Sequence, residues 1–421
     1  MQSADGTDDT SETRTPRVVR TKWHALALVS VAELLAMSLW FSASAVAPQL
    51  AALWGLAPAQ VGWLTSAVQL GFVVGALLSA VLTLADAVES RYLVAASALL
   101  GASTTVALAA VADGPLVAVG LRFLTGVALA GVYPPGMKLV AGWLPEERGL
   151  AIGTLVGALT VGSALPHLVR AFGGVDDPLF VLYVAAGLAT VAATLVVFVP
   201  PGPAAAPASR FDPRAVRRLL RDRPSLLANV GYFGHMWELY AVWTWIPVFL
   251  AFSVEAGSLS LAAPDRTVSL LAFLTIAVGG VGATVAGRLA DRVGRTAVTS
   301  VSMVVSGAAS LLAGVVFGAS LLVLTPFLLV WGVAIVADSA QFSAAVSELA
   351  ESDYVGTALT LQTAVGFLLT IVSIQLVPFV AGVVGWRWTF APLALGPLVG
   401  TVAMRRLRAH PASSAMAGGR R

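Results

Sequence analysis

Two loop segments, LTLADAVESR at residues 82–91 and GRLADRVGRT at residues 287–296, indicate how this 421-residue chain is organised. A shift of 205 positions, the difference between 86 and 291, places the first segment on the second and Asp86 on Asp291. The same shift pairs residues inside apolar runs: Glu33 with Glu238, Leu34 with Leu239, and Trp40 with Trp245. One register that aligns both a loop and two acids indicates that the chain is a duplicated unit.

The composition indicates that lipid is part of the solvent of this chain. Hydrophobic residues make up 58% of the sequence and charged residues only 11%, against about 25% charged in soluble domains. A helix needs about 20 apolar residues to cross the ~30 Å hydrocarbon layer. Twelve runs meet this need, near 24–47, 61–84, 92–112, 115–139, 150–171, 178–199, 225–250, 268–289, 297–317, 321–346, 356–380 and 384–404. They lack the alternation of barrel strands, so we predict an all-α integral membrane protein of twelve transmembrane helices.

Changes in composition along the chain predict two six-helix bundles, at 24–199 and 225–404, and three connecting or terminal segments. Residues 1–23 are polar without an apolar core, which is typical of a cytoplasmic tail rather than a signal peptide. The linker 200–224 opens with prolines and continues with basic residues. This pattern fits a short helix on the inner leaflet and a solvated linker equally well. Residues 405–421 form a basic C-terminal tail.

Lysine and arginine predict the orientation. Placing the N-terminus in the cytoplasm puts 21 of the 25 basic residues on that side. Arg170, Arg266 and Arg387 then fall outside, and Arg122 lies within a helix. This asymmetry is what the positive-inside rule demands. We therefore expect a multi-pass protein of the plasma membrane with both termini in the cytoplasm.

The motifs resemble those of one transporter family. The segment from Gly287 to Arg295 (GRLADRVGR) resembles the G-x-x-x-D-R-x-G-R loop of the major facilitator superfamily, between helices 8 and 9. The equivalent loop between helices 2 and 3 keeps only Asp86 and Arg91. Arg122-x3-Gly126-x4-Gly131 and Glu147-Arg148-Gly149 resemble two further motifs of the family. The resemblance implies two pseudo-symmetric bundles around a central pathway and transport by alternating access.

The resemblance also implies a conformational latch on the cytoplasmic side, formed by the two loops. In this interpretation Asp291 faces the positive N-terminal end of helix 5 near Gly149, and Asp86 faces helix 11 near Gly356. A plain role in setting topology is the alternative. The latch residues expected from the motif are Asp86, Arg91, Gly287, Asp291, Arg292 and Arg295.

Glu33 and Glu238 are the leading candidates for a proton pathway. Glu33 lies nine residues into the first apolar run, about 13 Å along a helix at 1.5 Å per residue, and Glu238 is its equivalent in the second half. A carboxyl group at that depth is costly and often lines a cavity or a proton route. His235, one turn before Glu238, could share its proton. The alternatives are structural hydrogen bonds for the acids and a satisfied core position for the histidine.

Arg122, Trp40 and Trp245 complete the expected pathway. Arg122 lies within helix 4, where it could balance a glutamate, bind an anionic substrate or serve packing. Trp40 and Trp245 share helical faces with the two glutamates and are candidates for the wall of the pathway.

Several function classes are excluded or disfavoured. The chain has no cysteine, only four histidines and no Walker motif, so we expect no metal site, no cofactor and no ATP-driven cycle. SVAELLAMSLW and GHMWELYAVWTWIP resemble segments of prokaryotic facilitators grouped loosely with cyanate and nitrate permeases. Helices 2 and 8, however, lack the mid-membrane arginines of nitrate carriers. Helix 5 departs from the antiporter pattern of the family, with Gly153-x8-Gly162-x3-Pro166.

We therefore predict a secondary transporter of a small organic solute that is coupled to protons, and not an enzyme. Its expected partners are the lipid bilayer, the solute and protons, and not nucleic acid. An uncoupled uniporter and a non-transporting membrane receptor or scaffold of the same fold remain alternatives.

Overall fold

The computed structural model describes residues 21–205, 221–258, 261–351 and 354–420. Over these residues the chain is helical and contains no strand. The first half contains α1 (Lys22–Met37), α2 (Ser42–Ala45), α3 (Ala47–Trp54), α4 (Pro58–Val81), α5 (Leu84–Ala87), α6 (Ser90–Val111), α7 (Pro115–Leu129), α8 (Tyr133–Ala141), α9 (Arg148–Val169), η1 (Arg170–Gly174) and α10 (Pro178–Val197). The second half contains α12 (Arg223–Ala256), α13 (Pro264–Val293), α14 (Arg295–Val316), α15 (Leu321–Ala337), α16 (Ser339–Leu349), α17 (Val355–Val384), η3 (Trp386–Trp388), η4 (Ala391–Ala394), α18 (Leu395–Ala409), η5 (Pro411–Ala415) and η6 (Ala417–Gly419).

These helices form the twelve expected membrane segments. Several of the segments consist of two or three shorter helices rather than one continuous helix. In the described residues, ten segments are long and apolar enough to cross a membrane. The first segment is divided into α1, α2 and α3, and the twelfth is shortened to η4 and α18. The fold prediction from hydropathy is therefore confirmed.

Breaks within segments follow local sequence signals. The fourth segment is interrupted between α7 and α8, where Pro134 and Pro135 lie in the first turn of α8. Proline has no N–H to give to the preceding turn, and it is tolerated at the start of a helix. The tenth segment is interrupted at Asp338, between α15 and α16. Such breaks leave backbone groups that side chains must satisfy.

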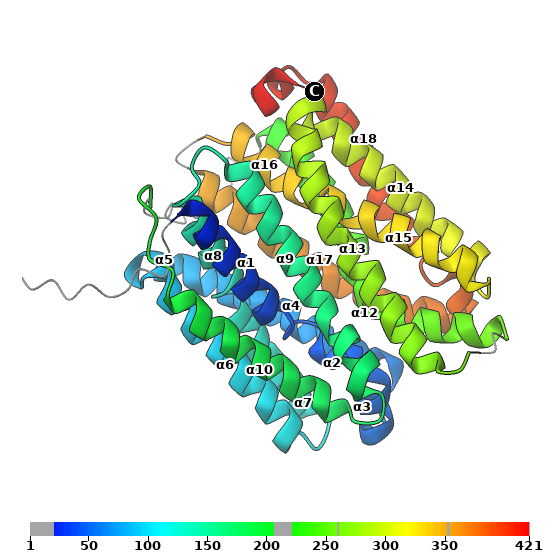
Figure 1. Cartoon of the computed structure of the whole chain (residues 1–421). Coiled ribbons are helices and arrows are strands. Elements are labelled where there is room, and N and C mark those ends of the chain that lie inside the picture. The colour runs from blue at the N-terminus through cyan, green and yellow to red at the C-terminus, as the bar shows by residue number, and fades with distance from the viewer. Residues whose placement is uncertain (1–20, 206–220, 259–260, 352–353, 421) are drawn as a thin grey trace, which may run out of the picture.

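The two halves form two bundles that meet along pairs of helices: α9 packs against α13, and α4 packs against α17 (Figure 1). Small residues permit the close approach. A Cβ atom added to Gly157 of α9 would lie 3.2 Å from the carbonyl oxygen of Gly280 in α13. Within the first bundle, a Cβ added to Gly71 would lie 2.0 Å from the carbonyl oxygen of Phe123. Van der Waals packing of small residues replaces the hydrophobic effect as the force that associates helices in lipid.

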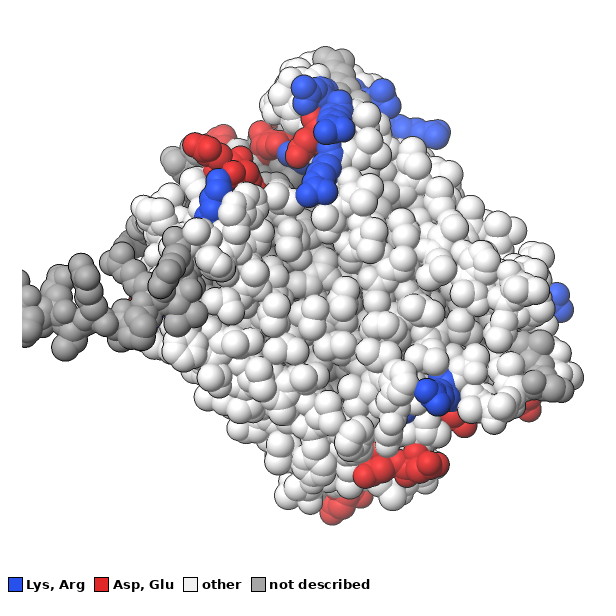
Figure 2. All heavy atoms as spheres, in the orientation of Figure 1, with Lys and Arg blue, Asp and Glu red and all other residues white. Residues whose placement is uncertain are grey.

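The surface has the pattern of a membrane protein. Figure 2 shows charged side chains gathered toward two opposite ends of the molecule, with a broad uncharged belt between them. We call the end that carries the start of α1 and the end of α18 the terminal face, and the opposite end the distal face. Large apolar side chains on the belt, such as Val301 and Leu311 of α14, are exposed. Aliphatic exposure on this scale belongs in lipid rather than water.

Candidate functional site

Glu33 of α1 lies buried beside the interrupted fourth segment. It is only 2% exposed, and its Oε1 atom has no hydrogen-bond partner in the described part of the chain. The other oxygen, Oε2, lies 3.0 Å from the position that a Cβ atom on Gly136 of α8 would take. A side chain at position 136 would therefore crowd the Glu33 carboxyl group, and glycine avoids this contact. Tyr133, one turn earlier, is within electrostatic range of both Glu33 and Tyr232 of the second bundle.

Six aromatic side chains fill the centre of the interface between the bundles. We call them the aromatic cluster: Trp40, Phe41 and Phe72 from the first bundle, and Tyr240, Trp243 and Phe367 from the second. The ring centroids of Phe72 and Phe367 are 4.7 Å apart, and those of Trp40 and Phe367 are 5.5 Å apart. All six side chains are buried. The centre of the interface is thus closed by rings in this conformation.

Glu238 of α12 is fully buried within the second bundle. Its Oε1 atom accepts a hydrogen bond from the Ser306 hydroxyl at 2.5 Å, and its Oε2 atom lies 3.4 Å from the Ser310 hydroxyl. Both serines belong to α14, so this carboxyl group faces α14 rather than the first bundle. Glu33 and Glu238 are therefore equivalent in sequence, but their surroundings differ.

A second buried acid, Asp338, lies next to His235. The His235 Nδ1 atom and the Asp338 Oδ1 atom are 2.9 Å apart, and both side chains are almost completely buried. The pair meets the distance of an ion pair but not the alignment of a hydrogen bond, and both atoms lack an aligned partner. Asp338 was not among the site residues predicted from the sequence. Its signal was an acid within the apolar run 321–346.

Arg122 of α7 holds the break in the first segment. Its guanidinium donates to the carbonyl oxygen of Leu39 at 2.9 Å and to that of Trp40, between α1 and α2. It also donates to the carbonyl oxygen of Leu64 in α4 at 3.2 Å. A glutamate, one of the partners that the sequence allowed, is not among its described contacts. The described contacts give Arg122 the role of satisfying backbone groups that the helix break leaves free.

The two tryptophans of the expected pathway lie in different places. Trp40 belongs to the aromatic cluster at the bundle interface. Trp245 lies within the second bundle, where its indole N–H donates to the carbonyl oxygen of Ile374 in α17 at 2.8 Å. Its ring packs against Trp386 of η3, with a centroid distance of 5.8 Å. Only Trp40 is brought to the central interface.

The loop after α13 is tied to its own bundle. Arg295 contacts Glu348 of α16 at 2.6 Å and the Gln341 side chain at 2.8 Å, and it lies 3.5 Å from Asp291. The backbone carbonyl of Asp291 accepts from Arg420 of the C-terminal tail. Gly287 is partly buried and Arg292 is exposed. The side chains at 148 and 149, where the expected latch partner of Asp291 begins, lie outside the described part of the chain.

In the corresponding loop of the first half, Arg91 pairs with Glu89 at 2.7 Å and donates to the carbonyl oxygen of Val197 at 3.2 Å. These contacts join the start of α6 to the end of α10. The side chain of Asp86 lies outside the described residues, and so does most of the linker, 206–220.

Polar contacts join the two bundles on the distal face. Arg170 of η1 donates to the Ser269 hydroxyl of α13 at 2.6 Å and to the Asp265 carboxylate at 3.1 Å. On the α4–α17 side, the Gln375 amide and the Ser66 hydroxyl are 3.2 Å apart in either orientation of the amide. The sequence predicts Arg170 outside the cytoplasmic side but gives no partner for it. We call these three contacts the distal contacts.

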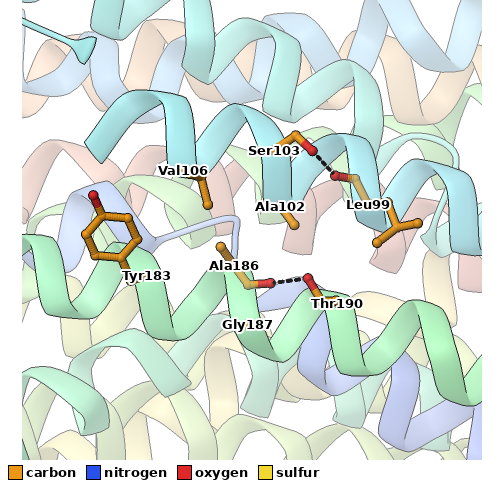
Figure 3. Close-up of a pocket in the computed structure, with 8 residues that line it drawn as sticks. All are labelled: Leu99, Ala102, Ser103, Val106, Tyr183, Ala186, Gly187 and Thr190. Atoms are coloured by element: carbon orange, nitrogen blue, oxygen red, sulfur yellow. Dashed lines mark hydrogen bonds between the residues drawn. The ribbon is translucent and has the colours of Figure 1, made fainter. Parts of the chain in front are cut away.

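The surface also carries a groove away from the interface. Figure 3 shows it between α6 and α10, lined by Leu99, Ala102, Ser103, Val106, Tyr183, Ala186, Gly187 and Thr190. Two of its hydroxyls are already used: Ser103 donates to the carbonyl oxygen of Leu99, and Thr190 to that of Ala186. The groove lies on the side of the first bundle away from the second bundle, and Ser103 and Thr190 offer it no free polar group.

Comparison with known proteins agrees with the fold. A model of the Major Facilitator Superfamily matches residues 29–264. The structure is similar to that of the nucleoside transporter NupG, with a TM-score of 0.70 and 15% identity over 92% of this chain and 99% of that chain. It is also similar to a bacterial homolog to the human lysosomal transporter Spinster in an inward-facing and unoccupied conformation. That likeness has a TM-score of 0.67 and 13% identity over 95% of this chain and 98% of that chain. At these identities the likeness is one of fold. No curated protein matches this sequence.

Proposed function

The chain belongs to the Major Facilitator Superfamily, and from this premise we propose that it moves a small organic solute by alternating access, coupled to protons. It is a multi-pass membrane transporter rather than an enzyme. We further place it in the plasma membrane, with the terminal face toward the cytoplasm, because most basic residues in the described part of the chain belong to that face.

The distal contacts support alternating access. They are few, polar and located at one end of the interface between the bundles: Arg170 with Asp265 and Ser269 on one side, and Gln375 with Ser66 on the other. Rigid bundles can exchange such contacts for water when they rock, without unfolding either bundle. In this proposal the aromatic cluster is the barrier between the two faces, so that a bound solute reaches only one face at a time.

Proton coupling rests on the observation that Glu33 and Glu238 are buried at equivalent positions of the two halves without a described basic partner. An ionised carboxylate in such surroundings is strongly disfavoured unless it gains water or a cation. A change in hydration during the transport cycle would therefore bind and release a proton. The His235–Asp338 pair, next to Glu238 in the second bundle, is a candidate relay.

The direct test is uptake into proteoliposomes that contain the purified chain. A pool of small metabolites, including nucleosides, sugars, amino acids and amines, would be offered with and without an imposed proton gradient. The proposal expects at least one solute to accumulate against its gradient, and an uncoupler to abolish that accumulation. Uptake that reaches only equilibrium and ignores the uncoupler would support a uniporter. The absence of uptake for every solute would favour a receptor or scaffold.

Glutamine substitutions locate the coupling. Glu33→Gln and Glu238→Gln keep the size and hydrogen-bonding capacity of the side chain but cannot exchange a proton. At least one of them should lose accumulation while retaining exchange of solute at equal concentrations. Arg266→Gln is a matched control on the distal face, because Arg266 is exposed and lies against the Phe172 ring at 4.9 Å. Normal accumulation in both glutamine variants would exclude coupling through these acids.

A further inference from the structure

The aromatic cluster has a chemical preference. The face of an aromatic ring carries partial negative charge, so rings that converge from several directions attract cations and repel anions. Here the first bundle contributes Trp40, Phe41 and Phe72, and the second contributes Tyr240, Trp243 and Phe367. Because the two sets belong to different bundles, rocking of the bundles separates the rings and exposes their faces.

Unsatisfied polar atoms gather around the same rings. The indole nitrogens of Trp40 and Trp243 have no hydrogen-bond partner among the described residues, and neither polar atom of the buried Gln69 side chain has one. Gln69 shares a helical face with Ser66 and Phe72, which contact α17. Buried polar groups are rarely left unpaired without a reason. A ligand held between the bundles could pair with the Gln69 amide, and an acceptor atom on its body could accept from the two indole N–H groups.

Among the described charged groups near this interface, only a negatively charged group has an atom without a partner. Glu33 is the nearby acid, and its Oε1 atom is unpaired. The cations of the same region are engaged: Arg122 with backbone carbonyls, Arg170 with Asp265, and Lys138 in an interaction of its own. An anionic solute would therefore meet a carboxyl group and ring faces but no uncommitted cation in the described part of the site. A cationic solute would meet complementary groups.

We propose that the central site binds an organic cation with an aromatic or apolar body, held by the ring faces of the aromatic cluster and by the Glu33 carboxylate. This inference rests on the proposed transport function and specifies its substrate class. Glu33 lies in α1, seven residues before Trp40 and nearer the start of that helix, which belongs to the terminal face. The cationic group therefore lies toward the terminal face from Trp40, and the apolar body lies among the rings.

Binding to the full chain in lipid nanodiscs tests the charge preference without any transport step. Isothermal titration calorimetry would compare three probes of similar size: phenyltrimethylammonium, benzyl alcohol and benzenesulfonate. We expect the cation to bind at least about tenfold more tightly than the neutral and the anionic probe. Equal or tighter binding of the alcohol or the sulfonate would overturn the inference. So would the absence of cation binding in the millimolar range.

Variants test the assigned residues. Glu33→Gln should lower the affinity for the cation about tenfold and leave that for benzyl alcohol unchanged, and Glu33→Asp should restore most of the preference. A merely structural role would instead change both affinities together. Glu255→Gln removes an exposed carboxylate from the distal end of α12 and serves as the matched control. An unchanged ratio of cation to alcohol affinity in Glu33→Gln would remove Glu33 from the site.

The two proposals fail in different ways. Uptake of only anions or neutral sugars by proteoliposomes would overturn the cation inference and leave the transport proposal intact. Selective binding of the cation together with no uptake of any solute would uphold the site and overturn transport.

Discussion

Arg170 offers a test of how the bundles close on the distal face. Its substitution by glutamine removes the charge that joins η1 to α13. The Arg170 side chain is 6% exposed, whereas that of Asp265 is 66% exposed. The ion pair itself therefore contributes below about 1 kcal/mol, because solvent screens it. The 2.6 Å hydrogen bond to the buried Ser269 hydroxyl is worth more, on the order of 1.5–3 kcal/mol for a charged donor.

Only the difference between the closed and open states shifts the equilibrium. In the open state water solvates the freed guanidinium, so we expect Arg170→Gln to weaken closure by about 1–2 kcal/mol. This corresponds to a change of about 5- to 30-fold in the ratio of distally open to distally closed molecules. The fold itself should be preserved, since both bundles keep their own packing.

The absence of native cysteines makes the assay direct. Ser66→Cys places one thiol at a fully buried position of the distal interface. Its rate of labelling by a membrane-impermeant maleimide on intact cells reports opening of that face. We expect labelling to rise several-fold in the Arg170→Gln background and to rise much less with Arg266→Gln, because the exposed contact of Arg266 with the Phe172 ring across the same interface is weaker. Equal labelling in all three backgrounds would refute the closing role of Arg170.

A cysteine at residue 256 should react with the impermeant maleimide on intact cells and one at residue 205 should not, since the orientation places them on opposite sides; the reverse pattern contradicts it. Glu238→Gln should abolish uncoupler-sensitive accumulation while it spares exchange, measured in proteoliposomes. Arg122→Leu leaves the buried Trp40 carbonyl without a described donor at about 1–3 kcal/mol, so thermal unfolding in detergent should show a loss of at least about 1 kcal/mol, and wild-type stability would exclude the bracing role. Asp291→Asn should slow turnover without reducing the amount of folded protein, and a wild-type rate would leave Asp291 a role in topology alone.

The sequence determined the elements of this protein and their order. Hydropathy is a local property, so twelve apolar runs predicted twelve membrane segments close to those observed, from the run at 61–84 for α4 to the run at 356–380 for α17. Duplication was also visible, because the two loops and the two glutamates keep one spacing. A membrane helix satisfies the hydrogen bonds of its own backbone. The length and the composition of a segment are therefore sufficient to predict that it spans the membrane.

Only the tertiary structure decided which side chains meet. Asp338 lies beside His235 because the tenth segment breaks where it crosses α12. Arg122 donates to carbonyl oxygens at the break between α1 and α2. Gln375 and Ser66 meet although they are 309 positions apart. Such pairs depend on how helices are rotated and offset against one another. Rotation and offset are set by the sum of many small packing contacts, which no local pattern in the sequence records.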